Sequence, residues 1–452
     1  MTDPLNLNNT ARTLPGGCES NDGLTMAKHE AVESFTEFLR GGATPAYPLE
    51  VHLDISNACN QRCVMCPRHS TLLSDRFESR RRFLPPVRDY INELTRTALK
   101  VQISGWGEPT AHPKFDEFLE CLADNRVLIE FFTNGSKLEQ WAPAIVDAGV
   151  HRLTVSMSGT TAREYESVYA GGNFDRLIGG IERLASARAR AGSRYPLIEI
   201  NSLSFRHHMG NLDRFVQMLA GLGVDRIAVT PLHEHIEVFP SLEGHAAADG
   251  WEDSHPVMKR AIQAAEDAEV TLDIHPNLAL YRPASPHPPA RPLHTLAEAV
   301  RPSTKRVIMH HQEPAESVEL KSPHRWVRRR LGIERVDTTT LCYEPFKTMY
   351  VASDGQVKAC CFMQDDAPAL GSVEVNRPLA VWRGSGFITV RRGVLRSEYP
   401  LRLCGNCLAQ HQAPANHGVD RLVDAYRCWA RSVLGDAADN GWGEIAARLE
   451  RA

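Results

Sequence analysis

The fold of this chain is decided around residues 51–68, which read VHLDISNACNQRCVMCPR. The stretch opens with a short apolar run, VHLDIS from Val51, which is typical of a buried β-strand. Cys59, Cys63 and Cys66 follow at once, in a Cys-x3-Cys-x2-Cys spacing. A strand that leads directly into a loop of chemically active side chains is the arrangement of (β/α) barrels, where chemistry lies at the carboxyl ends of the strands.

The same pattern, a short apolar run followed by a longer amphipathic run, recurs along the chain after this stretch. The further candidate strands are KVQISG from Lys100, LIEFFT from Leu128, RLTVSM from Arg152, LIEINS from Leu197 and RIAVTP from Arg226. Helical runs such as PKFDEFLECLAD and LDRFVQMLAGLG lie between them. Strand–helix alternation predicts a parallel sheet covered by helices. With the first strand, the six units predict an α/β fold, a partial (β/α)6 TIM-like barrel, over residues 49–276.

The remaining segments have a different character. Residues 1–48 are expected to form a tail and one leading helix, which AKHEAVESFTEFLRGG indicates. Residues 277–341 hold eight prolines, and eleven Lys/Arg against six Asp/Glu, so they are interpreted as an insertion or linker. In residues 342–410, alternating runs around Asp354-Gly355 predict a hairpin in a small C-terminal α+β domain. Residues 411–452 are interpreted as a helical tail.

Composition excludes several classes of protein. Hydrophobic residues make up 42% and charged residues 23% of the chain, which is ordinary globular usage. A formal net charge of −4 argues against a general nucleic-acid binder. No run approaches the roughly 18 apolar residues of a membrane-spanning helix, and the first residues do not resemble a signal peptide. We therefore expect a cytoplasmic protein with neither a membrane nor a nucleic-acid partner.

Cysteine usage indicates metal chemistry. The chain has eleven cysteines, eight of them in two groups, and clustered thiols in a cytosolic protein are more often metal ligands than disulfides. Cys59, Cys63 and Cys66 can hold three corners of a cubane iron-sulfur cluster and leave the fourth iron open. The alternative is a structural zinc site, with His69 as the fourth ligand.

This first cysteine group resembles the signature of the radical S-adenosylmethionine (radical SAM) enzymes. ISGWGEPTAHP, after the second strand, is similar to the Gly-Gly-Glu-Pro segment of that family, with Trp106 in place of its first glycine. The resemblance implies that Gly107 and Glu108 face the amino group of the SAM methionine. It also implies a catalytic [4Fe-4S] cluster that cleaves SAM to a 5'-deoxyadenosyl radical, which takes hydrogen from a substrate carbon.

Other segments share the resemblance. The residues that it places at SAM are Met65 at the adenine, Asn134 in FFTNGSKL, Ser156 and Ser158 in VSMSGTT at the ribose or carboxylate, and Asn201 and Arg206 at the methionyl carboxylate. Met65, Asn134 and the two serines also have structural alternatives. Met65 can be a core methionine, Asn134 an ordinary turn residue, and the hydroxyl side chains after the fourth strand can cap the next helix.

The second cysteine group resembles the SPASM extension found in many radical SAM enzymes. The resemblance implies one auxiliary [4Fe-4S] cluster with Cys342, Cys360, Cys404 and Cys407 as its ligands; a four-cysteine zinc site is the alternative. Cys361 neighbours Cys360 on a strand, so the two side chains point to opposite faces and only one can readily join the cluster. Cys361 is thus either buried or a free thiol.

For the reaction, we expect dehydrogenation, epimerisation or a related modification of a small carbohydrate-like or natural-product substrate. The roughly 48 residues before the first strand leave little room for a leader-binding domain. Epimerisation needs a thiol that returns a hydrogen atom, and Cys361 or Cys121 are the candidates. The alternatives are a ribosomal-peptide-modifying radical SAM enzyme and a non-catalytic iron-sulfur or zinc protein.

Three further features bear on partners. The physiological reductant is expected to be of the flavodoxin or ferredoxin type. The run RWVRRR at 325–330 can engage a substrate phosphate, although a solvated charge run is the more frequent explanation. The pairs His207-His208 and His310-His311 are expected to be surface residues.

Overall fold

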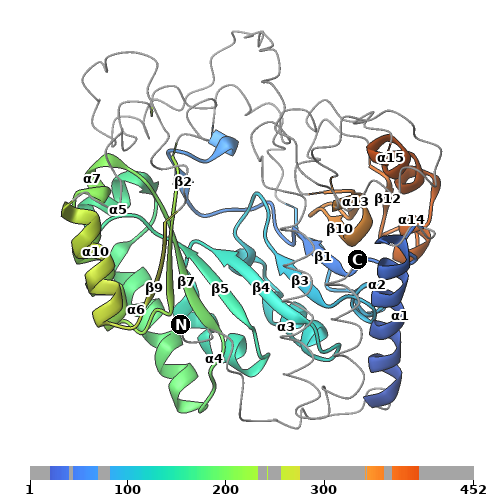
Figure 1. Cartoon of the computed structure of the whole chain (residues 1–452), viewed down its shortest axis with the longest axis horizontal. Helices are drawn as coiled ribbons and strands as arrows, with labels where there is room; N and C mark the ends of the chain where they lie inside the picture. Colours follow the sequence, from blue (N-terminus) through green and yellow to red (C-terminus); the bar gives the residue numbers. More distant parts are fainter. Residues whose placement is uncertain are drawn as a thin grey trace.

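The computed structural model describes residues 21–39, 44–69, 82–232, 242, 256–274, 342, 344–360 and 369–395. These residues form one ten-stranded sheet with helices packed against it (Figure 1). None of the described helices combines the length and the apolar character that a membrane crossing requires.

The six predicted strands are confirmed. They are β1 (Glu50–Leu53), β3 (Lys100–Ile103), β4 (Leu128–Thr133), β5 (Arg152–Ser156), β7 (Leu197–Leu203) and β8 (Arg226–Thr230), and each pairs in parallel with the next. A seventh parallel strand, β9 (Thr271–Ile274), follows β8. The prediction of six units omitted it, because TLDI is short and leads into the proline-rich segment.

Helices connect these strands, as the alternating pattern predicted. They are α2 (Arg88–Thr95), α3 (Phe115–Ala123), α4 (Leu138–Asp147), α5 (Ala162–Val168), α6 (Phe174–Arg190), α7 (Arg206–Met209), α8 (Leu212–Gly221) and α10 (Pro256–Asp267). Short 3-10 turns, η1 (Pro67–His69) and η3 (Pro109–Ala111), follow the first two strands of this series. The strands are short and parallel, so their carboxyl ends meet at one edge of the sheet, where these loops lie.

The two faces of the sheet differ in polarity. Val51, Leu53, Val101 and Ile103 are almost completely buried. Because side chains alternate along a strand, the residues between them project from the opposite, concave face. There the side chains of β1 and β3 are polar. The helices thus cover the apolar face, and the concave face is left for polar groups.

The leading helix is also confirmed, as α1 (Asn21–Leu39), and begins earlier than the apolar pattern indicated. Lys28 of this helix is completely buried, and its ammonium group donates to the carbonyl oxygens of Thr95 (2.9 Å) and Ala98 (2.6 Å). These carbonyls lie at the end of α2, where a helix leaves its last acceptors without internal partners. Lys28 therefore ties α1 to the barrel.

The predicted hairpin around Asp354-Gly355 is confirmed as β10 (Thr348–Val351) and β11 (Gln356–Lys358). Gly355 has a φ of +76°, which favours glycine at the turn. β10 pairs in parallel with β1, so the strand order is β12-β11-β10-β1-β3-β4-β5-β7-β8-β9, with β12 at Gly371–Ser372. The strands of the C-terminal segment thus continue the barrel sheet.

Three short helices accompany this segment: α13 (Glu344–Lys347), α14 (Pro378–Trp382) and α15 (Ser385–Leu395). The predicted boundaries at 276, 341 and 410 stay predictions. The insertion at 277–341, with Arg325–Arg330 and His310-His311, lies outside the described residues, as do Cys361, Cys404, Cys407 and the C-terminal tail.

Candidate functional site

The three cysteines lie on the loop that leaves the carboxyl end of β1. Cys59, Cys63 and Cys66 are half-buried. Cys63 belongs to the short strand β2 (Arg62–Cys63), which pairs with β6 (Tyr169–Ala170) and so braces the loop. Burial raises the pKa of the Cys66 thiol to about 11 and that of Cys63 well above its usual value, and the two neighbouring thiols raise the pKa of Cys63 further. The three side chains are therefore close enough to affect one another.

The three thiols can serve either kind of metal site. A cubane offers a separate iron atom to each thiolate, whereas tetrahedral zinc needs a fourth ligand, for which His69 is the candidate. Among the described residues, no group of three or more His, Cys, Asp or Glu is already arranged around a single point. The assignment of Cys59, Cys63 and Cys66 to a cluster stays a prediction.

The Gly-Glu-Pro segment packs directly on the cysteine loop. A Cβ atom on Gly107 would lie 1.9 Å from the Ser56 carbonyl oxygen, so only glycine fits there. The Glu108 amide donates to the Ala58 carbonyl oxygen at 2.7 Å. The Trp106 departure from the family pattern leaves this contact intact.

Arg68 is a site residue that sequence reasoning missed. Its guanidinium donates to the carbonyl oxygens of Asn57 and, at 2.9 Å, Trp106. It thereby joins the start of the cysteine loop to the Gly-Glu-Pro segment. The only signal in the sequence was its place two residues after the third cysteine, in CPR.

Glu108 is expected from the resemblance to meet the SAM amino group, but the structure shows its carboxylate already engaged. One oxygen accepts from the Thr110 amide (3.0 Å), the Thr110 hydroxyl (2.5 Å) and the Thr133 hydroxyl (2.6 Å), and the other accepts from the Asn134 amide (2.6 Å). Glu108 is 2% exposed, and burial raises its pKa. Its observed contacts are those of a positioning residue, because they join the Gly-Glu-Pro segment to the end of β4 and the turn that follows it.

Asn134 does more than form a turn. Its side-chain amide donates to Asn60 Oδ1 at 2.9 Å and approaches Cys59 Sγ at 3.8 Å. Its side-chain oxygen Oδ1 accepts from the Ser136 backbone amide, as in an ordinary Asn-Gly turn. The interpretation of FFTNGSKL as a turn is therefore confirmed, and the role of Asn134 at SAM stays a prediction.

The other residues that the resemblance placed at SAM fall into two groups. Ser156 and Asn201 are cross-strand neighbours on the concave face and half-buried. Arg206 is exposed at the start of α7, and Met65 is 7% exposed and packs in the core cluster. The roles of Ser156, Asn201 and Arg206 stay predictions, whereas the packing of Met65 favours the alternative of a core methionine.

Two expectations require correction. Ser158 is completely buried, and its hydroxyl is hydrogen-bonded to the Tyr169 hydroxyl (3.2 Å) and the Leu203 amide (3.0 Å), so it faces the protein interior rather than SAM.

His208, expected at the surface, is also completely buried. Its Nδ1 accepts from the Gly159 amide and its Nε2 faces the Ser202 hydroxyl, while burial lowers its pKa to about 3. A neutral histidine here supports the loop after β5.

The remaining cysteines are only partly described. Cys342 and Cys360 are half-buried, flank the β10–β11 hairpin and pack against the core. Cys121 is 2% exposed on the buried face of α3, which lies on the helical side of the sheet. Its nomination as a hydrogen donor was therefore wrong, because no substrate on the concave face can reach it. Cys361, the other candidate donor, lies outside the described residues.

A second missed residue is Asp54, at the end of β1. Its carboxylate accepts from the backbone amides of Trp106 and Ser56 and, at 3.4 Å, from the Tyr350 hydroxyl of β10. Burial raises its pKa to about 7. Asp54 therefore joins the C-terminal hairpin, the cysteine loop and the Gly-Glu-Pro segment. Its signal was a carboxylate within an otherwise apolar strand, LDI.

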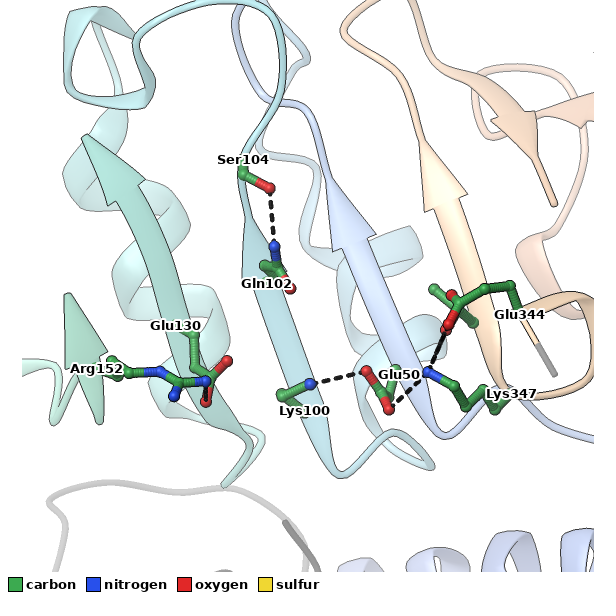
Figure 2. Close-up of polar contacts among 9 residues, drawn as sticks. Glu50, Lys100, Gln102, Ser104, Glu130, Arg152, Glu344 and Lys347 are labelled. Atoms are coloured by element: carbon green, nitrogen blue, oxygen red, sulfur yellow. Dashed lines mark hydrogen bonds and ion pairs between the residues drawn. The ribbon is translucent and has the colours of Figure 1, made fainter. Parts of the chain in front are cut away.

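Charged side chains near the amino ends of neighbouring strands form ion pairs. Glu50 lies between Lys100 (2.8 Å) and Lys347 (3.1 Å), and Arg152 contacts Glu130 at 2.8 Å (Figure 2). Burial alone would raise the pKa of Glu50, but the two ammonium groups hold it well below its usual range. Sequence reasoning could not find these pairs, because their partners are 22 to 297 positions apart along the chain.

Comparison with known proteins agrees with this geometry. Residues 53–201 match the model of the radical SAM superfamily, and residues 342–408 match that of an iron-sulfur cluster-binding domain, SPASM. The matched ranges include Cys59, Cys63 and Cys66, and all four cysteines proposed for the auxiliary cluster.

Among curated relatives, the chain is 27% identical over 240 residues to mycofactocin maturase MftC of Mycobacterium ulcerans, which covers 53% of this chain and 58% of that one. It is 26% identical over 201 residues to a probable GTP 3',8-cyclase of Methanococcus maripaludis, covering 42% of this chain and 63% of that one. The chain thus spans less than two thirds of the length of either relative.

Among solved structures, this chain is similar to SuiB of Streptococcus suis bound to precursor peptide SuiA. The alignment covers 85% of this chain and 74% of the SuiB chain, with a TM-score of 0.49 and 13% sequence identity.

The sheet and its loops define an α/β protein of the partial-barrel class, with a thiol-rich loop at the carboxyl end of the first strand. Residues 53–201 thus match the radical SAM superfamily and residues 342–408 match SPASM, which is the arrangement of a radical SAM enzyme with a C-terminal SPASM domain. The relatives named maturase and cyclase are enzymes, and the cofactors of this family are [4Fe-4S] clusters and S-adenosylmethionine.

Proposed function

We propose that this chain is a radical SAM enzyme that modifies a carbon centre of a peptide substrate. Its catalytic cluster and SAM, when bound, supply the reductive cleavage that generates a 5'-deoxyadenosyl radical. The expectation of a small carbohydrate-like substrate is the weaker one, because one relative is named a mycofactocin maturase. The observation that carries the proposal is the loop of three half-buried thiols at the carboxyl end of β1.

Different residues of the chain have different roles at the catalytic cluster. We assign Cys59, Cys63 and Cys66 as its ligands. Gly107 lets the backbone approach the cysteine loop closely. Glu108 and Asn134 hold the Gly-Glu-Pro segment and the turn after β4 against that loop. This network fixes the loop before any cofactor binds, which lowers the cost of ordering the site.

For the C-terminal segment, we propose that Cys342, Cys360, Cys404 and Cys407 hold one auxiliary [4Fe-4S] cluster. With all four irons bound to protein, this cluster is suited to electron transfer or structural support. A cytoplasmic flavodoxin- or ferredoxin-type protein would supply the electrons.

The test is anaerobic reconstitution followed by assays of iron, sulfide and 5'-deoxyadenosine in the presence of dithionite. Wild type is expected to cleave SAM, Cys63→Ala to lose one cluster and all cleavage, and Cys121→Ala to retain both. Cysteine substitution at the buried Cys121 is the matched control, because it removes a thiol without touching the loop. Zinc alone in the purified protein, or iron without any 5'-deoxyadenosine, would refute the assignment.

Substrate class is then tested with the active enzyme. The enzyme is incubated in separate reactions with peptides encoded near its gene and with GTP. The products of each reaction are identified by mass spectrometry. Loss of two mass units from a peptide, or deuterium exchange into it from solvent, would support the proposal. Conversion of GTP, with every peptide unchanged, would overturn the substrate class and leave the radical SAM assignment intact.

A further inference from the structure

A groove of about 1590 Å³ lies between α1, the segment leading into α2, and the segment from β12 to α14. Figure 1 places these elements together at the right-hand end of the sheet. None of the lining residues belongs to the cysteine loop or to the ion pairs of Glu50 and Glu130. The groove is therefore separate from the cluster site.

Exposed apolar side chains border this groove. Met26 of α1 is 70% exposed, Val87 at the start of α2 is 48% exposed, and Val375 before α14 is 82% exposed. They account for three of the five large hydrophobic residues that are exposed in the described part of the chain. Apolar residues from three distant segments rarely gather on a surface unless something covers them.

The charge of the groove indicates the charge of the partner that covers it. Its lining holds five carboxylates and two guanidinium groups, namely Glu30, Glu33, Asp89, Glu93, Glu374, Arg96 and Arg377. One of the two cations, Arg377, is paired with Glu93 at 3.0 Å. Negative charge therefore dominates, which attracts a basic partner and repels an acidic one.

We propose that this groove binds a basic amphipathic peptide segment of a partner protein. Apolar side chains of the segment cover Met26, Val87 and Val375, and its Lys or Arg side chains meet Glu33, Asp89 and Glu374. The inference goes beyond the proposed function, because binding requires neither cluster nor SAM. It also separates this face from any acidic electron carrier, which the same carboxylates would repel.

The test uses two fluorescently labelled synthetic peptides of the same length. One contains only Lys and Leu, and the other contains only Glu and Leu. Binding of each peptide to the reconstituted enzyme is measured by fluorescence anisotropy. Wild type is expected to bind the Lys/Leu peptide, more weakly as salt is added, and not the Glu/Leu peptide. The triple variant Glu33→Lys, Asp89→Lys, Glu374→Lys is expected to weaken Lys/Leu binding by about tenfold or more and to gain Glu/Leu binding.

The matched control is Glu139→Lys, Asp175→Lys, Glu182→Lys, which changes the net charge equally on the exposed faces of α4 and α6. It is expected to bind as wild type does. Met26→Ser with Val375→Ser tests the apolar contribution and is expected to weaken binding by several-fold. Because both residues are highly exposed, this second variant should fold normally.

An equal loss of binding in the control triple variant would overturn the proposal, because it would show a response to net charge rather than to this groove. Absence of Lys/Leu binding in wild type would also overturn it. SAM cleavage is measured in every variant, so that failure of the groove is distinguished from failure of the cluster site.

Discussion

Asp54 and Glu108 are two carboxylates that the fold buries beside the cysteine loop. Both are 5% exposed or less, and both accept hydrogen bonds from the loops that surround the three thiols. Their geometry is that of positioning residues, because the described structure shows their oxygens bonded to protein. At this scale, the shape of the site depends on buried polar groups that must remain satisfied.

Glu108→Gln is expected to destabilise the enzyme and reduce SAM cleavage. A glutamine amide replaces one acceptor oxygen by a donor, so at least one of the buried Thr110, Thr133 or Asn134 donors loses its acceptor. Loss of a buried hydrogen bond to a charged group costs about 1.5–3 kcal/mol. Thermal unfolding and SAM cleavage measure the effect. The exposed Glu139→Gln on α4 is the control, and equal melting temperatures for the two variants would contradict the assigned role.

Asp54→Asn is expected to change how stability depends on pH. The pKa of Asp54 is raised to about 7 in the folded state from its usual 3.8, so its ionisation opposes folding. The contribution of Asp54 to stability is greatest below about pH 4 and declines as pH rises to about 7. Asparagine cannot ionise and lacks this decline. Between pH 6 and 7, wild type should lose about 1 kcal/mol of stability relative to the variant; parallel melting-temperature profiles would refute this.

Buried polar contacts add to apolar packing in joining elements that are distant in sequence, and α1 is the clearest case. Lys28 of α1 donates a hydrogen bond to Thr95 at the end of α2, and these two residues are 67 positions apart in the sequence. Burial lowers its pKa to about 7. The helix is thereby fixed beside the groove that we propose as a docking site.

Lys28→Met is expected to lower stability by about 1–3 kcal/mol, because the carbonyls of Thr95 and Ala98 lose their donor. The deficit should also depend on pH. The folded state releases the Lys28 proton near pH 7, whereas the unfolded chain keeps it until about 10.5. Wild type therefore gains stability relative to the variant as pH rises from 7 to 9. Lys259→Met, on the exposed side of α10, is the control, and a deficit that shrinks over this range would contradict the prediction.

At the scale of the whole molecule, one sheet includes both the radical SAM and the SPASM matches. β10 lies beside β1, and their backbones are joined further by the bond from the Asp54 amide to the Val351 carbonyl oxygen. Lys347 and Glu50 pair across the same seam. The two clusters would therefore be carried by a continuous β-structure, with Asp54 at the junction.

A chain ending at residue 276 is expected to aggregate. Removal of β10 would leave β1 as an edge strand with unpaired backbone groups, and would uncover the buried Val51 and Leu53 beside it. Such edges pair with other chains. Size-exclusion chromatography, with the full chain as the reference, measures the outcome. A monodisperse, folded truncation would show that the seam does not stabilise the barrel.

The sequence by itself determined the six parallel strands, the leading helix, the Asp354-Gly355 hairpin and the two cysteine groups, because periodicity and turn residues are local signals. It missed β9, which is short, and it could not assign Ser158 or His208 correctly. Whether a hydroxyl or an imidazole is exposed depends on which distant strands and helices cover it.

Only the tertiary structure decided that β10 joins β1, that Glu50 lies between Lys100 and Lys347, and that Asp54 connects the cysteine loop to the C-terminal hairpin. Each of these contacts joins residues tens to hundreds of positions apart. Their formation depends on strand order and register, which local propensity does not encode.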